Sequence, residues 1–148
     1  MSNPPLTRVF LMTQIKPEMD KIQIIQQMYR NFSEKNMTAV LSCFDKDVVW
    51  IRPGEPEIPF SGVFKGMEGL VKMFTIVAQT VKIKSLIPKR FLCNDDVVVV
   101  IGEDAADVIA TGKSYTSEWV YVYTFKDEKI IHVQVYIDTL EIAKAFQP

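Results

Sequence analysis

The 148-residue chain has little of what metal, disulfide and nucleic-acid chemistry require. It contains one histidine, two cysteines in no spaced motif, and a formal net charge of −1. One histidine without a C-x-x-C or H-E-x-x-H motif predicts no metal site, and two unspaced thiols predict no disulfide framework. A concentrated basic face, which phosphate binding needs, is also missing, and this argues against nucleic acid as a partner.

Long apolar runs are missing as well. No segment approaches the roughly 20 apolar residues that a membrane-spanning helix requires. The apolar stretch of residues 9–12 is too short for a signal peptide, and no small-residue cleavage site follows it. With reduced thiols, these features predict a cytoplasmic protein without a membrane partner. We expect a flexible leader over residues 1–15 and a single domain over residues 16–148.

The periodicity of apolar residues places helices first and strands second. Helical spacing predicts helices over residues 17–36, 38–44 and 67–80, with Pro17 in the first turn. Strands are expected over residues 48–51, 82–93, 97–104, 113–125 and 129–137, and a final helix begins near Asp138. Between them lies a loop over residues 53–66, with a short strand around residues 63–64. Short turns between successive strands predict an α+β domain, with helices on one face of a mainly antiparallel sheet.

Several segments, in this order and spacing, resemble a known family. They are Phe32–Trp50, Pro59–Phe74, Val97–Glu103, Ala110–Tyr115 and Lys129–Thr139. The chain is similar to the SnoaL-like polyketide cyclases and ketosteroid isomerase-like proteins of the nuclear-transport-factor-two-like superfamily. The resemblance implies a cone in which a strongly curved sheet wraps around helices and encloses an apolar pocket. It covers nearly everything after residue 20.

The pocket wall implied by this resemblance includes aromatic side chains from several elements. They are Trp50, Phe60, Phe64, Phe74, Trp119, Tyr121 and Tyr123. The row at residues 115, 119, 121, 123 and 125 has two interpretations: ordinary core packing, or a flat apolar wall for a ring-shaped ligand whose orientation tyrosine hydroxyls fix. The second predicts a small hydrophobic molecule as the partner.

Alternation along the last strand separates two faces. Ile131, Val133, Val135 and Ile137 point one way, whereas His132, Gln134, Tyr136 and Asp138 point the other. Because the resemblance puts the final aspartate at the pocket, Gln134, Tyr136 and His132 are expected at the pocket or its rim. The Ile/Val face then needs a cover, and we expect a homodimer formed through the sheet. A bulge in the strand would reverse these faces.

Asp138 has two interpretations. It precedes a helical pattern, where an aspartate caps the helix by accepting backbone N–H bonds. Alternatively, it is a general base whose pKa an apolar pocket raises, as polyketide cyclases of this family imply, with Tyr136 orienting or stabilising an enolate oxygen. No phosphate loop or Ser/His/Asp arrangement is present, so such an enzyme would need no cofactor.

Other sites of the superfamily do not match this chain. The steroid isomerase base falls near Arg52, and the position of its tyrosine falls on Met28, with Tyr29 one residue away. Epoxide hydrolysis needs an arginine where Gly102 stands, although Asp104 lies roughly where one of its acids would be. The sequence thus favours a cofactor-free cyclase or isomerase acting on a hydrophobic carbonyl compound, with a non-catalytic ligand-binding module or a protein-interaction domain as alternatives.

Overall fold

The computed structural model describes residues 21–148, so the predicted leader and the helix start at Pro17 lie outside the described residues. A helix over residues 21–33 comes first. The elements that follow are α2 (Met37–Leu41), β1 (Phe44–Arg52), β2 (Gly62–Lys65), α3 (Gly66–Thr80), β3 (Val81–Asn94), β4 (Val97–Val108), β5 (Ser114–Lys126), β6 (Lys129–Ile137) and α4 (Thr139–Phe146). Each of the predicted elements is present, and several strands are longer than the sequence pattern indicated.

Two tight turns join the long strands. Asp95 and Asp127 adopt φ angles of 52° and 57°. Aspartate tolerates this left-handed region better than most residues because its short polar side chain bonds to nearby backbone. The β3–β4 and β5–β6 hairpins therefore form at the turns that the sequence predicted.

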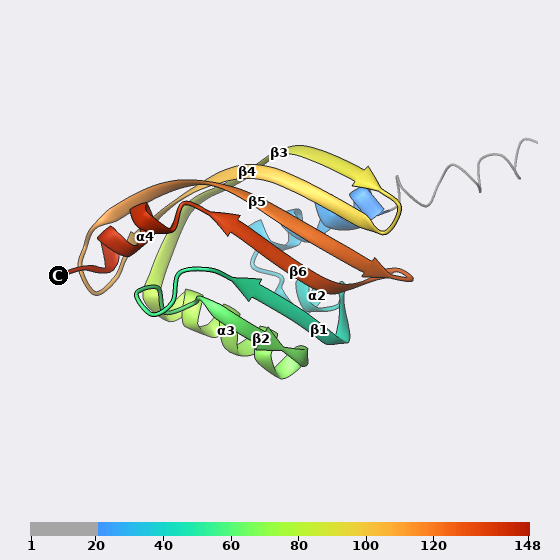
Figure 1. Ribbon diagram of the computed structural model, residues 1–148, viewed down its shortest axis with the longest axis horizontal. Helices are drawn as coiled ribbons and strands as arrows, with labels where there is room; N and C mark the ends of the chain where they lie inside the picture. Colours follow the sequence, from blue (N-terminus) through green and yellow to red (C-terminus); the bar gives the residue numbers. More distant parts are fainter. Residues whose placement is uncertain (1–20) are drawn as a thin grey trace, which may run out of the picture.

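The six strands form one sheet in the order β2-β1-β6-β5-β4-β3. Only β1 and β6 pair in parallel, and every other neighbouring pair is antiparallel. The sheet is strongly curved, with α3 and the N-terminal helices on its concave side and α4 at one end (Figure 1). This arrangement confirms the predicted α+β cone.

The main core lies on the concave side of the sheet. Large buried side chains there include Trp119, Tyr123, Val98 and Val100 from the strands, and they pack against Ile25, Leu70 and Met73 from the helices. A second cluster joins α4 to the sheet through Phe60, Tyr115, Ile142 and Ala145. Helices on the concave side thus shield one face of the sheet from water.

The two faces of β6 are the reverse of those expected. Val133 pairs with Tyr123, and Val135 pairs with Tyr121, so these valines share the buried concave face with the aromatic row. The register shifts next to Phe125, which places Ile130 on that face as well. Because the chain's own core covers this face, the Ile/Val stripe needs no second subunit. The homodimer remains a prediction, but the Ile/Val stripe no longer supports it.

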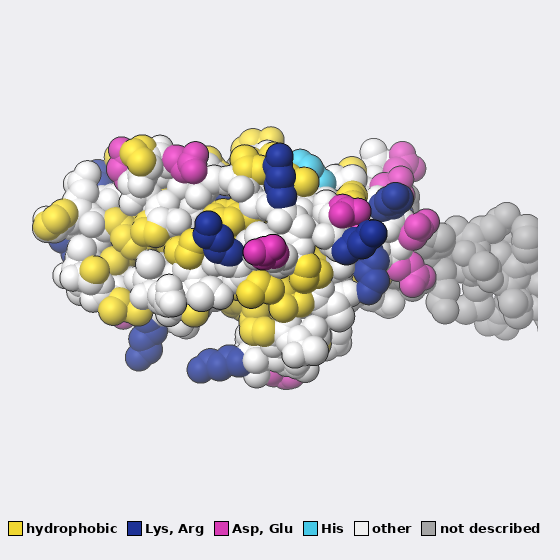
Figure 2. All heavy atoms as spheres, turned by 90° about the horizontal axis from the view of Figure 1, so that it is seen from below, with side chains coloured by type: hydrophobic (Ala, Val, Ile, Leu, Met, Phe, Trp, Pro, Cys, Tyr) yellow, Lys and Arg dark blue, Asp and Glu magenta, His cyan; other side chains and the backbone are white. Residues whose placement is uncertain are grey.

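The surface carries charges of both signs. On the face that Figure 2 shows, Lys and Arg side chains alternate with Asp and Glu, and hydrophobic side chains gather in patches between them. Neither sign of charge dominates that face. Within residues 21–148, none of the helices has the length and hydrophobicity needed to cross a membrane.

Candidate functional site

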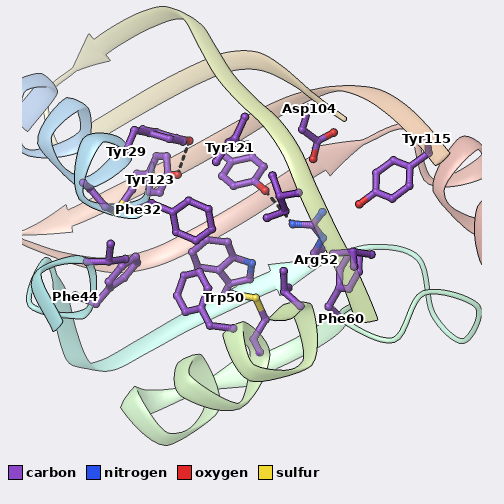
Figure 3. A pocket seen from close by; sticks show the side chains of 18 residues that line it. Tyr29, Phe32, Phe44, Trp50, Arg52, Phe60, Asp104, Tyr115, Tyr121 and Tyr123 are labelled. Carbon is purple, nitrogen blue, oxygen red and sulfur yellow. Dashed lines mark hydrogen bonds between the residues drawn. The ribbon is translucent and has the colours of Figure 1, made fainter. Parts of the chain in front are cut away.

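A cavity of about 80 Å³ lies between the concave face of the sheet and the helices. That volume is several times the roughly 10–15 Å³ that one water molecule needs, so the cavity has room for several water-sized groups. Figure 3 shows the 18 side chains that line it. Most are apolar or aromatic, as is usual for pockets that bind small molecules.

Five of the predicted pocket residues line this cavity. They are Trp50, Phe60, Phe74, Tyr121 and Tyr123. Four others do not: Phe64, Trp119, Gln134 and His132. Phe64 and Trp119 pack elsewhere in the main core, while Gln134 and His132 lie on the opposite face of β6 from Val133 and Val135. The aromatic row therefore serves both as core packing and as cavity wall.

Four polar side chains meet at one end of the cavity, where they come from three different strands. Arg52 ends β1, Asp104 lies on β4, and Tyr115 and Tyr121 lie on β5. Their polar groups point into the same space (Figure 3), and Nη1 of Arg52 donates to the Tyr121 hydroxyl at 2.9 Å. The guanidinium also lies 4.8 Å from the centre of the Phe60 ring. A cation, a carboxylate and two hydroxyls thus converge in an otherwise apolar hollow.

Asp104 is a carboxylate in a partly dry position. Burial raises its pKa, whereas the hydrogen bond from the Ser117 hydroxyl and the charge of Arg52 lower it, and burial is the largest of the three effects. Ser117 donates to Oδ1. No residue of the described part bonds to Oδ2, so this oxygen can take a proton from a ligand. A carboxylate with a raised pKa in a cavity is a candidate general base.

The tyrosines keep their protons. Burial raises the pKa of Tyr121, an effect that Arg52 opposes, and burial likewise raises the pKa of Tyr115. Farther along the cavity, the hydroxyls of Tyr29 and Tyr123 share a hydrogen bond of 2.8 Å, and burial raises both of their pKa values. At neutral pH these hydroxyls are therefore donors as well as acceptors.

Asp138 and Tyr136 lie away from the cavity. Asp138 is exposed and caps α4, where its carboxylate accepts from the backbone N–H of Glu141 at 3.4 Å. Tyr136 is 58% exposed on the outer face of β6. The expectation that these side chains face the pocket is corrected: strand pairing turns Tyr136 outward, and the start of α4 holds Asp138 at the surface.

The cap has a measurable consequence. We expect Asp138→Ala to lower the free energy of unfolding by about 1 kcal/mol, because an N-cap residue satisfies a backbone donor at the helix start. Urea denaturation of both proteins measures this difference.

The control needs an exposed acid with no structural role of its own. Asp127→Ala, in the exposed β5–β6 turn, is a poor control because Asp127 has a positive φ. Asp45→Ala, at a half-buried position of β1, would be confounded by the bond that Asp45 accepts from the backbone N–H of Asp47. Glu118→Ala, on the outer face of β5, is therefore the control, and an equal loss there would remove the capping interpretation.

Sequence reasoning noticed Arg52 only as a departure from the steroid isomerases, and Asp104 only as a rough match to one acid of the epoxide hydrolases. A usable signal was present on β4, where buried Val98, Val100, Gly102, Ala106 and Val108 share a face with Asp104. An acid at the one polar position of such a face needs an explanation. No comparable signal marked Arg52 or the place where the two side chains meet.

Among residues 21–148, no three His, Cys, Asp or Glu side chains come together as a metal site.

Known proteins share this architecture. A family model described as SnoaL-like domain matches residues 25–133. An NTF2-like protein from Burkholderia xenovorans is 25% identical, with 88% of this chain and 98% of that chain covered and a TM-score of 0.80. An NTF2-like protein of unknown function from Burkholderia pseudomallei is 21% identical, with coverage of 87% and 98% and a TM-score of 0.80.

A third structure is TerC, co-crystallized with polyporic acid. It is 23% identical, with 87% of this chain and 99% of that chain covered and a TM-score of 0.75. No curated protein matches the chain. The similarity to solved structures thus establishes the fold over nearly the whole of each relative.

Proposed function

Because this chain belongs to the SnoaL-like domain family, we propose that it binds a compact carbonyl compound in the cavity and moves a proton on it without a cofactor. Asp104 acts as the general base in this proposal, in place of Asp138. Arg52 and Tyr121 stabilise the oxygen that becomes negative. The outcome is an isomerisation or a ring closure.

One observation supports this proposal above the others: a base and oxygen-stabilising donors face the same dry space. Asp104 has a free carboxylate oxygen, and Arg52 and Tyr121 form a hydrogen-bonded pair beside it. Donors held in place in a cavity of low polarity stabilise developing charge more strongly than water does, because they need no reorganisation. The same groups at the surface would have little effect.

The proposed step balances within the substrate and the protein. Oδ2 of Asp104 removes a proton from the carbon next to the carbonyl, and the electrons of the C–H bond form a C=C bond. The carbonyl π electrons move to oxygen, which becomes an enolate held by Arg52 and Tyr121. Asp104 then returns its proton to a different atom of the substrate. In a ring closure, the enolate carbon instead attacks a second carbonyl carbon of the same substrate, and Asp104 gives its proton to the alkoxide oxygen that this attack forms. In neither case is an oxidant or reductant required.

The cavity size limits the ligand. A volume of about 80 Å³ is smaller than the roughly 150 Å³ of a cavity that binds benzene, so the smallest ring compounds fit best and a tetracyclic steroid is too large. The co-crystal of TerC with polyporic acid shows that one protein of this fold was obtained with an organic acid. It supports a small organic ligand for the cavity of this chain.

Hydrogen–deuterium exchange tests the proposal even while the substrate is unidentified. One- and two-ring ketones, with and without a carboxylate, are incubated in D₂O, and proton NMR follows the loss of the α-proton signal. We expect the protein to accelerate exchange of at least one compound above the buffer rate. Exchange at the buffer rate across the whole set would contradict acid–base catalysis and favour the alternative of a non-catalytic binding module.

The pH dependence of this exchange identifies the base. A base works when ionised, and burial raises the pKa of Asp104 above the ordinary 3.8. Acidification therefore protonates Asp104, and the rate is expected to fall with a midpoint above pH 3.8, earlier than an exposed aspartate would give. Exchange rates from about pH 3 to 8 give the midpoint of the rate, and the carboxyl ¹³C shift of Asp104 over the same range gives the midpoint of its ionisation. Two clearly different midpoints would assign the base to another group.

A further inference from the structure

Arg52 is a buried cation that forms no direct ion pair among the described residues, although it interacts electrostatically with Asp104. Its exposed fraction is 7%, and its only hydrogen bond within residues 21–148 goes from Nη1 to the neutral hydroxyl of Tyr121. No carboxylate of these residues forms an ion pair with it, and its Nε is buried without a hydrogen-bond partner among them. A buried charge is costly unless a counter-charge and hydrogen bonds compensate it. The site thus lacks hydrogen-bond acceptors for the donors of Arg52.

Other hydrogen-bond donors at the cavity also lack an acceptor. Nε1 of Trp50 is buried without a partner in the described part of the chain, and Trp50 lines the same cavity as Arg52. The Tyr121 hydroxyl accepts from Arg52, so its own proton is free to be donated. The one carboxylate, Asp104, accepts from Ser117 at Oδ1, which leaves Oδ2 as its one free acceptor oxygen. Donors therefore outnumber acceptors, and a ligand rich in acceptor oxygens would restore the balance.

We infer that the ligand of this cavity is an anion: a compact ring compound with a carboxylate or an acidic enol, whose charged oxygens bind Arg52. The inference rests on the proposed function and narrows its substrate class. A planar guanidinium offers several donors in a fixed fork, which suits the two oxygens of a carboxylate or of an ionised 1,3-dicarbonyl. Trp50 Nε1 and the Tyr121 hydroxyl supply further donors.

Asp104 sets the orientation of such a ligand. Its negative charge repels the anionic group, which therefore lies on the side of Arg52, while a neutral part of the ligand lies against Asp104. The ring is surrounded by aromatic side chains such as Phe60 and Phe74. For a keto acid, the carbon that loses its proton would lie next to the base.

Binding of matched probes tests the inference. The probes are benzoate, its neutral isostere benzamide, and a cyclic 1,3-dione that is ionised at neutral pH. Isothermal titration calorimetry at pH 7 measures each dissociation constant. We expect at least one of the two anions to bind about 10–100 times more tightly than the amide, the range that a charge-assisted hydrogen bond provides. Whether the carboxylate or the dione binds more tightly identifies the kind of anion.

Variants test whether Arg52 causes the preference for anions over the amide. Arg52→Gln is expected to reduce anion affinity about 10–100-fold and to change amide affinity less than about threefold. Arg90→Gln, at an exposed arginine of β3, is the matched control and is expected to change neither. Circular dichroism verifies that each variant folds. If the glutamine variant does not fold, Arg52→Lys replaces it in the test, because lysine keeps the positive charge but lacks the planar set of donors of a guanidinium. The anion affinity of the lysine variant is expected to be intermediate.

Three results would overturn the inference: equal affinity of wild-type protein for anions and amide, no binding of either anion, or an unchanged anion preference in the Arg52 variants. Asp104→Asn separates this inference from the catalytic proposal. Removing the nearby negative charge should preserve or strengthen anion binding while it abolishes proton exchange. A protein that binds the anions through Arg52 but exchanges no α-proton would refute the catalytic proposal alone.

Discussion

Replacing Asp104 by asparagine is expected to slow α-proton exchange by about 10²–10⁴-fold, the usual contribution of a positioned general base. Asparagine has nearly the shape of aspartate and can still accept from Ser117, but it cannot take a proton. The change therefore removes basicity and leaves the cavity lining in place. Proton NMR in D₂O, with the best compound of the ketone set, measures the loss.

Stability distinguishes a lost base from a lost fold. Because burial raises the pKa of Asp104, folding favours its protonated form, and at pH 7 the ionised form costs the folded state free energy. Asparagine removes that cost, so the variant is expected to be at least as stable as the wild type in urea denaturation. Asp138→Asn is the matched control, since Asp138 is exposed at the cap of α4. Full exchange in the Asp104 variant would refute Asp104 as the base, and loss of exchange in the Asp138 variant alone would assign the role to Asp138.

Gly102→Ala is expected to lower the free energy of unfolding by about 2–3 kcal/mol, the range for an overpacked core. A Cβ atom at Gly102 would lie 2.5 Å from the carbonyl oxygen of Ile87 and 2.5 Å from the Trp119 ring. Neither neighbour can yield easily. The oxygen belongs to the backbone of β3, and the ring is fully buried, stacked on Tyr29 and 4.7 Å from the Tyr121 ring centre.

Thermal denaturation measures this loss, which corresponds to a fall in Tm of about 5–10 °C for a domain of this size. Gly112→Ala introduces no clash, because nothing lies within 4 Å of the added Cβ, but its positive φ of +71° alone costs about 1–2 kcal/mol, so Gly102→Ala is expected to lose more stability than Gly112→Ala. Combining Gly102→Ala with Trp119→Phe should recover part of the stability if the ring is one of the two obstacles. An unchanged Tm in the single variant would show that β4 can move away from β3.

The sequence predicted most of the fold because the deciding signals are local. Asp95 and Asp127 lie in turns that aspartate favours, and the apolar periods separate helices from strands. The side-chain alternation of β6 was also readable. Which of its two faces lies inside was not, because that depends on the pairing of Val133 and Val135 with β5 and on the helices packed behind them.

The candidate site was only partly predictable for the same reason. Aromatic residues such as Trp50 and Tyr121 were found because large apolar rings must be buried somewhere. The polar group was not, since Arg52 and Asp104 lie far apart in the chain and no spacing rule connects them. Asp138 drew attention because it ends an apolar strand, yet local capping explains it fully.

By itself, the amino-acid sequence determined the elements and the α+β class, because hydrophobic period and turn chemistry act between near neighbours along the chain. The family followed from the resemblance of several segments to known proteins. Tertiary structure alone decided which residues meet in the cavity. Curvature of the sheet brings the end of β1 to face β4 and β5, so a buried arginine, a carboxylate and two hydroxyls share one dry space. Electrostatic effects of that kind arise only from distance in three dimensions and from the exclusion of water.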